Sequence, residues 1–234
     1  MKVMILAAGK GERMLPLTRD TPKPLLQAGG KALIQHLLEK LAAAGFTDLV
    51  INHAWLGEQL EKALGDGSAF GVSIRYSAEH EALETAGGII KALPLLGDKP
   101  FVVVNGDIWT DYSFSGLKRF SAMEQLAHLV MVSNPPQHPE GDYVLDGNRL
   151  SLKDKITVRV SDACMALTYS GIAVLHPELF SNLPIQKLPL SPLFESAIKQ
   201  GRVSAEFYRG EWFDIGTVER LDSLNKNLLQ NFPA

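Results

Sequence analysis

Short apolar runs alternate with helical patterns along the first half of the chain. The apolar runs are residues 3–7, 49–52 and 72–76, and stretches with helical periodicity at residues 32–44 and 56–64 lie between them. This alternation is typical of βαβ units, which build a parallel sheet. In the first helical stretch, leucine and isoleucine recur every three or four positions, so we expect this helix to pack on one face of the sheet.

The pattern changes in the second half. Residues 101–104 form an unbroken apolar run, which predicts a central strand covered on both faces, and residues 87–93 predict a helix before it. Beyond Asn134, a proline pair at residues 135–136, an Asp-Gly-Asn turn at residues 146–148 and short alternating runs predict hairpins instead of further βαβ units. The helical pattern returns at residues 218–229.

Composition and charge narrow the class of protein. Of the 234 residues, 46% are hydrophobic and 21% are charged, and no repeat or linker divides the chain, so we expect one soluble α/β domain over residues 1–234. The net charge of −3 argues against general binding to nucleic acid or anionic membranes. With a single cysteine and no apolar run near the ~20 residues that span a bilayer, we expect a cytoplasmic protein.

A loop that contains two glycines follows the first predicted strand, with the sequence Gly9-Lys10-Gly11-Glu12-Arg13. Glycines at such a strand exit allow backbone N–H groups to approach phosphate closely. The dinucleotide fingerprint would require a third glycine where Met14 stands, and the P-loop would require a Gly-Lys-Ser/Thr triplet that is absent here. On these residues alone, phosphate binding and a tight strand-to-helix turn both stay open.

The segment after this loop presents a lysine between two prolines. Pro22 and Pro24 flank Lys23, and we expect them to hold the backbone extended and to prevent a helix there. Residues 10–23 contain four basic and two acidic residues, a local charge of +2 within a chain of net charge −3. Cations in this arrangement can offset the charge of a nucleoside triphosphate.

Loop and arm together resemble a known signature. Leu-Ala-Ala-Gly-Lys-Gly-Glu-Arg-Met at residues 6–14 and Thr-Pro-Lys-Pro-Leu at residues 21–25 are similar to the motifs of sugar-1-phosphate nucleotidylyltransferases. Residues 51–57, 83–88 and 104–112 most resemble the branch that transfers a uridylyl group from UTP to N-acetylmuramate α-1-phosphate in peptidoglycan recycling. That reaction gives UDP-N-acetylmuramate and pyrophosphate.

The resemblance implies a fold, a cofactor and a division of labour. The fold is the nucleotidyltransferase fold, a Rossmann-like, mostly parallel mixed sheet flanked by helices. Within the single domain, residues 1–112 would bind the nucleotide and residues 113–234 the sugar, with Mg²⁺ as the required ion. UTP and the sugar 1-phosphate are then the expected binding partners, and the oligomeric state stays open, a monomer being compatible with the sequence.

Two basic residues have catalytic roles by this resemblance. Arg13 would neutralise the leaving pyrophosphate, and Lys23 would hold the α-phosphate as charge develops. The alternative for both is a solvated basic loop. Glu84 stands where many relatives have glycine, so contacts to the base are least secure there. The residues implied to bind the nucleotide are Leu6, Ala8, Gly9, Lys10, Gly11, Glu12, Arg13, Lys23, Ser77, Glu79 and Thr85.

A carboxylate is expected where the central strand ends. Asp107 follows the apolar run at residues 101–104, and α/β proteins bind ligands at the carboxyl ends of their strands. Mg²⁺ takes hard oxygen ligands, usually one or two carboxylates together with phosphates. The resemblance adds Asp214 as a second metal ligand, although the sequence does not show whether the two acids meet. The alternatives are a turn aspartate for Asp107 and a helix-capping acid for Asp214.

The sugar pocket is implied by resemblance alone. Asn and Asp can bond sugar hydroxyls, and glycine leaves room for a ring. A Glu-Lys-Pro segment found in several hexose-using relatives is absent here, and residues 158–163 stand nearby instead. The substrate-binding residues implied are Asn105, Gly141, Asp142, Ser170 and Gly171. For the lactyl carboxylate of a muramyl sugar, the candidates are Arg149, Arg159 and Arg202, each of which is equally well explained as a surface cation.

Other functions share part of this pattern. A guanylyl, thymidylyl or cytidylyl transferase would carry the same loop and arm. A glycosyltransferase would be expected to have an Asp-x-Asp motif, whereas Trp109 stands two positions after Asp107. A non-catalytic module that senses nucleotide sugars would not require Arg13, Lys23, Asp107 and Asp214 together.

Overall fold

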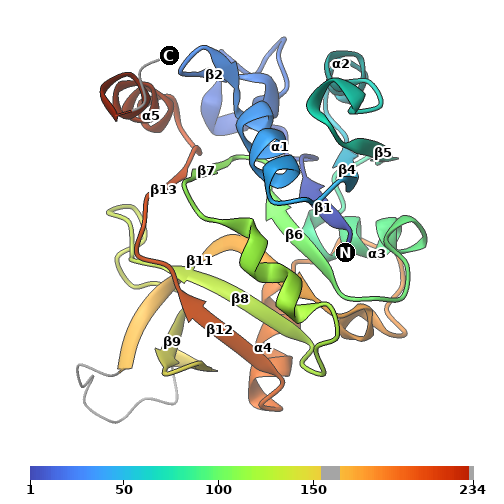
Figure 1. The fold of residues 1–234 in the computed structure, drawn as a ribbon, viewed down its shortest axis with the longest axis vertical. Helices are drawn as coiled ribbons and strands as arrows, with labels where there is room; N and C mark the ends of the chain where they lie inside the picture. The colour runs from blue at the N-terminus through green and yellow to red at the C-terminus, as the bar shows by residue number, and fades with distance from the viewer. Residues whose placement is uncertain (154–163, 232–234) are drawn as a thin grey trace.

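The core of the protein is a mixed sheet, seen in a computed structural model that describes residues 1–153 and 164–231. Within these residues the sheet has nine strands in the order β5-β4-β1-β6-β11-β8-β12-β10-β9 (Figure 1). The strands are β1 (Val3–Leu6), β4 (Asp48–His53), β5 (Ser73–Ala78), β6 (Phe101–Asn105), β8 (Ala127–Val132), β9 (Tyr143–Asp146), β10 (Arg149–Ser151), β11 (Cys164–Leu175) and β12 (Val203–Phe207).

The first half of the sheet has the predicted βαβ arrangement. Strands β5, β4, β1 and β6 are parallel to one another, and helices α1 (Leu33–Ala43), α2 (Gly57–Leu64) and α3 (Glu84–Leu96) connect them. The prediction of a helix at residues 87–93 is confirmed, although α3 extends further at both ends. β6 lies between β1 and β11, and residues 101–104 are fully buried, which confirms the central strand.

The second half of the sheet is mainly antiparallel, which corrects the expectation of a mostly parallel sheet. β11 is antiparallel to β6, β8 and β9, and β9 forms a hairpin with β10 around Gly147, while β12 and β8 are a parallel pair. Connection length explains the β9–β10 pair, because a tight hairpin reverses the chain, whereas parallel neighbours require a crossover of a dozen or more residues. The antiparallel pairs of β11 join strands that are distant in sequence, so no local turn signals them. The Rossmann-like pattern therefore applies to β5, β4, β1 and β6.

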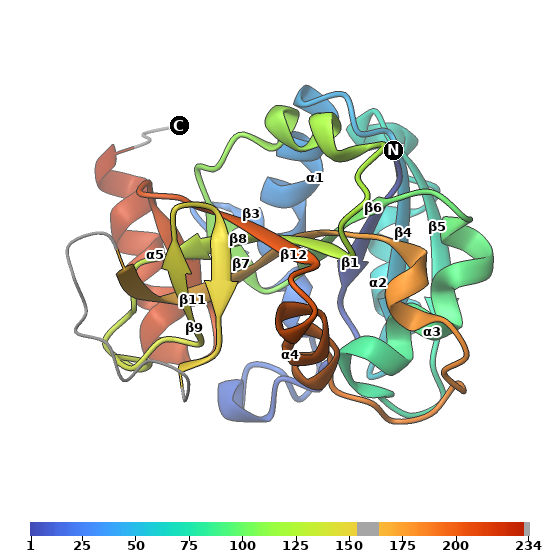
Figure 2. The same cartoon turned by 90° about the horizontal axis from the view of Figure 1, so that it is seen from below.

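Helices cover both faces of the sheet. Val3 and Ile5 share a buried cluster with residues of α1 and α2, whereas Met4 joins residues of α3 and α4 (Ser191–Lys199). This division follows from the strand itself, since successive side chains point to opposite faces. Figure 2 shows α1 on one side of the sheet and α3 and α4 on the other.

The C-terminal helix α5 (Val218–Asn231) packs against the N-terminal part of the chain. Leu224 and Leu228 share a buried cluster with Met14, and Asn225 Oδ1 accepts a 2.8 Å hydrogen bond from the N–H of Gly29. Smaller elements complete the fold: the hairpin β2 (Gln27–Ala28) and β3 (Lys31–Ala32), the pair β7 (Ile108–Thr110) and β13 (Trp212–Asp214), and the short 3-10 helices η1 (Glu12–Met14), η2 (Lys23–Leu25), η3 (Ser68–Phe70), η4 (Phe114–Phe120) and η6 (Pro177–Phe180).

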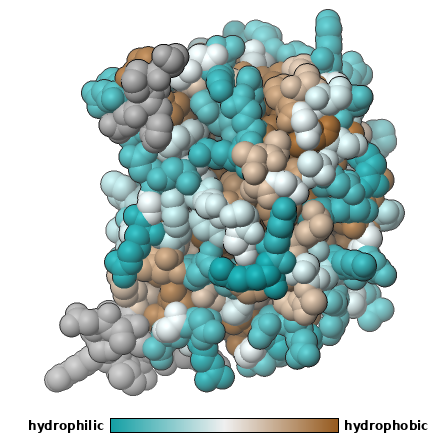
Figure 3. Space-filling view, viewed as in Figure 1, coloured by the Kyte–Doolittle hydropathy of each residue, from teal (hydrophilic) through white to brown (hydrophobic). Residues whose placement is uncertain are grey.

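The surface is mixed in character. Figure 3 shows hydrophilic residues over much of the face seen there, with smaller apolar areas between them. Scattered apolar side chains of this kind are ordinary on folded proteins. Within residues 1–153 and 164–231, no helix has both the length and the apolar character needed to cross a bilayer.

A polar cluster connects the segment around η4 to β12. The carboxylate of Glu206 accepts hydrogen bonds from the Tyr112 hydroxyl and from Arg119, and His128 Nε2 lies 3.6 Å from Glu206 Oε2. The His128 ring lowers the pKa of Glu206 to about 2, with help from the Tyr112 hydroxyl and the Arg119 charge. At 3.6 Å the imidazole is beyond normal hydrogen-bond length, so Tyr112 and Arg119 are the direct partners of the carboxylate.

Glu206→Gln is expected to reduce stability at neutral pH and to matter less in acid. Because the folded pKa is lowered, the contribution of the carboxylate is complete above about pH 5 and is lost as pH falls through the folded pKa of about 2. We expect the variant to lower the free energy of unfolding by about 1–2 kcal/mol at pH 6, and by less than half of that at pH 3. Urea unfolding at both pH values measures this. The exposed Glu58→Gln on α2 is the control, and an equal loss for Glu206→Gln at both pH values would contradict the assignment.

Candidate active site

A cleft of about 590 Å³ opens at the carboxyl ends of β1, β4 and β6. This volume is within the usual range for small-molecule sites, and α/β sheets commonly bind ligands at this edge. The residues that line it are Leu6, Ala7, Ala8, Gly9, Lys10, Gly11, Glu12, Arg13, Lys23, Pro24, Asn52, Ala82, Glu84, Thr85, Gly106, Asp107, Lys187 and Gly216.

The glycine loop forms one wall of the cleft. Gly11 has φ +67°, and a Cβ at this position would lie 2.9 Å from Thr18 Cγ2, so the conformation and the close contact both require glycine. Thr18 donates a 2.8 Å hydrogen bond from Oγ1 to the Gly11 carbonyl oxygen. Met14, which directly follows the loop, is fully buried against residues of α5. The loop is therefore anchored from behind, while Lys10 and Arg13 are exposed at the cleft.

Lys23 begins the short helical turn η2, which corrects the prediction that its flanking prolines prevent helix. Pro22 is extended and stands just before the turn, as predicted, but Pro24 lies within its first residues, where a missing N–H has no cost because no intrahelical partner exists. The Lys23 residue is only 8% exposed, and its Nζ donates a 2.5 Å hydrogen bond to Asp107 Oδ2. A buried ammonium requires such a partner.

The two predicted metal acids come to neighbouring positions. β7 and β13 pair so that Asp214 lies opposite Ile108, and the N–H of Ile215 donates a 2.9 Å hydrogen bond to the Asp107 carbonyl oxygen. The Asp107 carboxylate contacts Lys23 and lines the cleft, whereas the Asp214 carboxylate forms an ion pair with Arg220. In the described part of the chain, no group of three or more His, Cys, Asp or Glu side chains is arranged as a metal site. Asp107 lines the cleft, whereas Asp214 is not among its lining residues. Carboxylates are the ligands that Mg²⁺ takes, one or two at a time, and it completes its shell with phosphate and water.

A chain of buried hydrogen bonds runs beneath the cleft. Asn52 accepts a 3.0 Å bond from the N–H of Ala7 at Oδ1 and donates a 2.7 Å bond from Nδ2 to Glu79 Oε1. The other carboxylate oxygen of Glu79 accepts a 2.9 Å bond from the N–H of Leu83. Glu79 is 6% exposed, so both of its oxygens are used to fix the loop before α3.

The predicted nucleotide residues therefore divide into two groups. Those that line the cleft are Leu6, Ala8, Gly9, Lys10, Gly11, Glu12, Arg13, Lys23 and Thr85. Ser77 and Glu79 are buried and do not contribute to this lining, because β5 turns Ser77 inward and Glu79 bonds to Asn52 and Leu83.

Sequence reasoning missed the residues at the far wall. A backbone clip of residues 186–188 lies along the start of α3, where the Leu188 carbonyl oxygen accepts bonds from the N–H groups of Ala86 (3.0 Å) and Gly87 (3.2 Å). This clip brings Lys187 to the cleft, beside Glu84. Glu84 has φ +61°, the left-handed region that non-glycine residues rarely adopt. No local motif marks Lys187. For Glu84 there was a signal in the sequence: many relatives have glycine at this position, which indicates an unusual backbone conformation.

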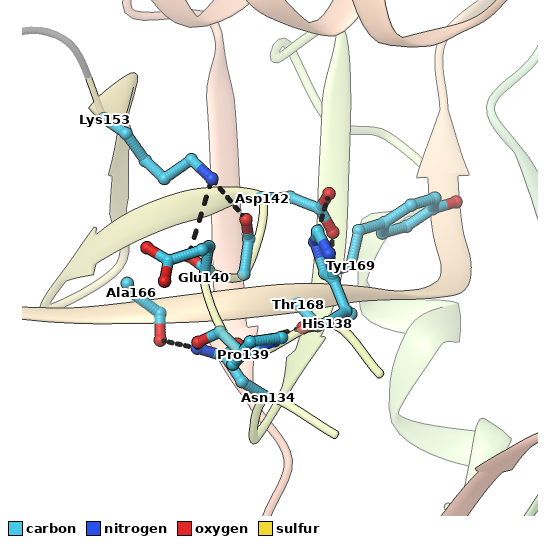
Figure 4. Close-up of polar contacts among 10 residues, drawn as sticks. Asn134, His138, Pro139, Glu140, Asp142, Lys153, Ala166, Thr168 and Tyr169 are labelled. Atoms are coloured by element: carbon cyan, nitrogen blue, oxygen red, sulfur yellow. Dashed lines mark hydrogen bonds and ion pairs between the residues drawn. The ribbon is translucent and has the colours of Figure 1, made fainter. Parts of the chain in front are cut away.

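The predicted sugar residues lie along β11, outside the lining of this cleft. Asp142 Oδ2 accepts a 2.8 Å bond from the N–H of Tyr169, and His138 Nε2 lies 3.1 Å from Asp142 Oδ1 (Figure 4). Lys153 donates a 2.5 Å bond to the Gly141 carbonyl oxygen. The loop that carries Gly141 and Asp142 is therefore fixed against β11.

The other three sugar residues meet near the end of β6. Gly171 has φ +82° at an irregularity in β11, and a Cβ there would lie 2.6 Å from the side-chain nitrogen of Asn105. Ser170 is 1% exposed, and its carbonyl oxygen accepts a 2.9 Å bond from Trp212 Nε1. Asn105 lies two residues before Asp107, and Trp212, which bonds to Ser170, lies two residues before Asp214, so the two predicted regions are contiguous.

The arginines proposed for a lactyl carboxylate receive no support as a group. Arg202 is committed to Glu178, with a 2.7 Å contact, and to the Glu124 carbonyl oxygen. Arg149 is on β10, which lies next to the edge strand β9 and five strands away from β1. Arg159 lies outside the described residues.

The chain is similar in sequence to several known proteins. Residues 2–145 match the nucleotidyl transferase family model. The chain is 50% identical over 228 residues to N-acetylmuramate α-1-phosphate uridylyltransferase of Neisseria meningitidis, covering 94% of this chain and 95% of that protein. It is 34% identical to the enzyme of the same name in Caulobacter vibrioides, covering 91% and 90%.

More distant matches are similar in fold. Mannose-1-phosphate guanyltransferase of Aspergillus oryzae is 31% identical, and the match covers 92% of this chain but 61% of that protein. A solved structure of a protein assigned as a glucose-1-phosphate thymidylyltransferase from Bacillus anthracis superposes with a TM-score of 0.83 at 24% identity, covering 100% and 97% of the two chains. At this identity the structural match supports the fold alone.

Glu84→Gly is expected to be more stable than Glu84→Ala by about 1 kcal/mol. Both variants remove the carboxylate, but only glycine adopts a left-handed backbone without steric cost. Thermal unfolding of the two variants measures the difference. The matched control is Asn182, which is exposed with φ +62°. Because asparagine tolerates this backbone region, Asn182→Gly should gain less stability over the wild type than Glu84→Gly does. Equal melting temperatures for the two Glu84 variants would contradict the prediction.

Proposed function

The chain belongs to the nucleotidyl transferase family, and from this premise we propose that it transfers a uridylyl group from UTP to N-acetylmuramate α-1-phosphate. The products would be UDP-N-acetylmuramate and pyrophosphate, in cytoplasmic peptidoglycan recycling. The 50% identity to the Neisseria meningitidis enzyme, over nearly the whole of both chains, supports the choice of nucleotide and sugar. The reaction type is supported independently by the cleft.

One observation carries the reaction type: the Lys23–Asp107 pair stands in the same cleft as the glycine loop. Lys10, Arg13 and Lys23 line this cleft together with the Asp107 carboxylate. A site for a neutral ligand would not require three cations around an open strand exit. The set suits a triphosphate, whose charge would otherwise oppose the approach of a second phosphorylated substrate.

The proposed chemistry needs positioning more than proton transfer. A phosphate oxygen of the sugar 1-phosphate attacks the α-phosphorus of UTP, and the bond from that phosphorus to the bridging oxygen of pyrophosphate breaks. The attacking oxygen is already anionic, so no general base is required. Lys23 would bind the α-phosphate and Arg13 the departing pyrophosphate, so that both offset charge on the transferring group.

Asp107 and Asp214 are our proposed ligands for Mg²⁺. Asp214 lies opposite Ile108 in the β7–β13 pair, directly after Asp107, and each carboxylate contacts a cation, Lys23 for Asp107 and Arg220 for Asp214. When bound, Mg²⁺ would supply further neutralisation of phosphate charge. The two ion pairs hold the carboxylates in place beforehand, so the acids would not have to be ordered by the metal.

The sugar would lie beside the end of β6, along β11. Asn105 and Asp142 offer hydrogen-bonding side chains there, and glycine at position 171 allows the Asn105 side chain to pack directly against β11. Because Asn105 immediately precedes Gly106, a cleft residue, this position would place the sugar phosphate next to the α-phosphorus.

Pyrophosphate release tests the substrates directly. We expect the highest kcat/KM for UTP with N-acetylmuramate α-1-phosphate, when UTP, GTP, CTP and dTTP are each combined with the 1-phosphates of N-acetylmuramate, glucose, N-acetylglucosamine and mannose. Each triphosphate without a sugar phosphate is the control for hydrolysis. If GTP with mannose 1-phosphate were the best pair, the guanyltransferase function of the Aspergillus oryzae relative would replace our proposal.

Lys23→Met and Asp107→Asn are each expected to lower kcat by on the order of 100-fold, because both would act on charge that develops in the transition state. They should differ in metal dependence: Asp107→Asn would raise the Mg²⁺ concentration needed for half-maximal rate, whereas Lys23→Met would not. Lys31→Met is the matched control, since Lys31 is exposed and pairs with Glu39 outside the cleft. Near-normal turnover in both cleft variants would exclude this mechanism.

A further inference from the structure

Two charged side chains at the far wall of the cleft take no part in the chemistry above. Glu84 and Lys187 both line the cleft and are both exposed. Across residues 1–153 and 164–231, neither side chain has a hydrogen bond or an ion pair. A carboxylate and an ammonium that line one cleft, each with its bonding capacity free, are suited to bind a ligand that offers both a donor and an acceptor.

The position of Lys187 is set by backbone contacts. Leu188 donates a 3.0 Å bond from its N–H to the Leu83 carbonyl oxygen, and its own carbonyl oxygen accepts from Ala86. On the other side, a Cβ at Gly87 would collide with the Gln186 carbonyl oxygen, so the clip lies directly on the helix. The backbone of Lys187 is therefore held in place between Gln186 and Leu188, both of which contact the start of α3.

The position of Glu84 is set just as firmly. Its left-handed backbone stands between Leu83, whose N–H is bonded to the buried Glu79, and the first turn of α3. A conformation with a steric cost persists only where neighbouring contacts impose it, and such positions are frequently functional. The carboxylate is thus presented at the cleft by a rigid segment.

Charge assigns this wall to the uncharged part of a nucleotide. Lys10, Arg13 and Lys23 come from the glycine loop and from η2, where they suit phosphates, whereas Glu84 comes from the start of α3 and Lys187 from the clip. A triphosphate beside Glu84 would be repelled, and the helix N-terminus offers it little, since the N–H groups of Ala86 and Gly87 are both bonded to the clip. The base is the part of the ligand that can use both a carboxylate and an ammonium without a net charge of its own.

We propose that Glu84 and Lys187 select the base: the Glu84 carboxylate accepts a hydrogen bond from the ring N3–H of uracil, and the Lys187 ammonium donates one to the adjacent O4. This rests on the proposed function, in which UTP is the nucleotide. Cytosine has the same ring size but reverses both groups, with an acceptor at N3 and an amino donor at C4. Once the bound base has displaced water from them, the carboxylate and the ammonium would both be left unpaired against cytosine, and buried unpaired groups give strong discrimination.

The test compares UTP with CTP for Glu84→Gln and Lys187→Met. We expect each change to lower kcat/KM for UTP by about 10–100-fold, as for the loss of one charge-assisted hydrogen bond, and to lower it much less for CTP. The UTP-over-CTP preference should then fall at least about tenfold, most in Glu84→Gln, because a glutamine amide can donate to N3 of cytosine. Glu81→Gln and Lys199→Met are the matched controls, since both residues are exposed and lie outside the cleft lining.

A second variant protects the test against misfolding. Glu84→Gly suits the left-handed backbone, so it should fold and still lose the preference for UTP. An unchanged UTP-over-CTP ratio in all three variants would overturn the inference. The inference would also be overturned if a Glu84 variant lost the discrimination between UTP and dUTP instead, because this result would assign Glu84 to the ribose. If the wild-type protein transferred no uridylyl group at all, the proposed function would fail together with this inference, whereas the outcomes above leave the proposed function intact.

Discussion

The salt bridge between Lys23 and Asp107 is the contact on which the cleft depends. Lys23 is only 8% exposed, and its ammonium requires a partner of opposite charge, because a buried charge without one is costly. This requirement holds the arm that carries Lys23 at the exit of β6. The N–H of Ile215 bonds to the Asp107 carbonyl oxygen, which connects the arm and the exit of β6 to the C-terminal part of the chain. One ion pair thus brings three segments that are distant in sequence to a single site.

A second set of contacts keeps the two walls of the cleft at a constant separation. The hydrogen bonds from Ala7 to Asn52, from Asn52 to Glu79, and from Leu83 to Glu79 run from the end of β1 to the start of α3. Buried polar groups that are fully bonded in this way are rigid, because breaking any one bond leaves a desolvated partner. The wall that carries the glycine loop and the wall that carries Glu84 are therefore mechanically joined.

The sequence predicted the regular elements of the first half well and the site in part. The helix at residues 32–44 and the strand at residues 101–104 were predicted reliably, because an amphipathic or a fully apolar pattern reflects directly which faces of the element are exposed to water. Glu79 was predicted as a nucleotide ligand, and the structure buries its carboxylate against Asn52 and Leu83, contacts that a sequence does not show. Lys187 was not predicted, because its place depends on the pairing of Leu188 with Leu83, and neither segment carries a local signal for the other.

The sequence by itself determined the glycine loop, the arm with Lys23, the membership of a nucleotide-transferring family and the two acids at strand ends. Only the tertiary structure decided that Asp107 and Asp214 come to adjacent positions, that the second half of the sheet is antiparallel, and that Lys187 stands beside Glu84. The physical reason is one of range: local patterns reflect backbone sterics and the partition of side chains between water and core, which act within a few residues. The meeting of distant side chains depends on strand register and on the packing of whole elements, which no short stretch of sequence contains.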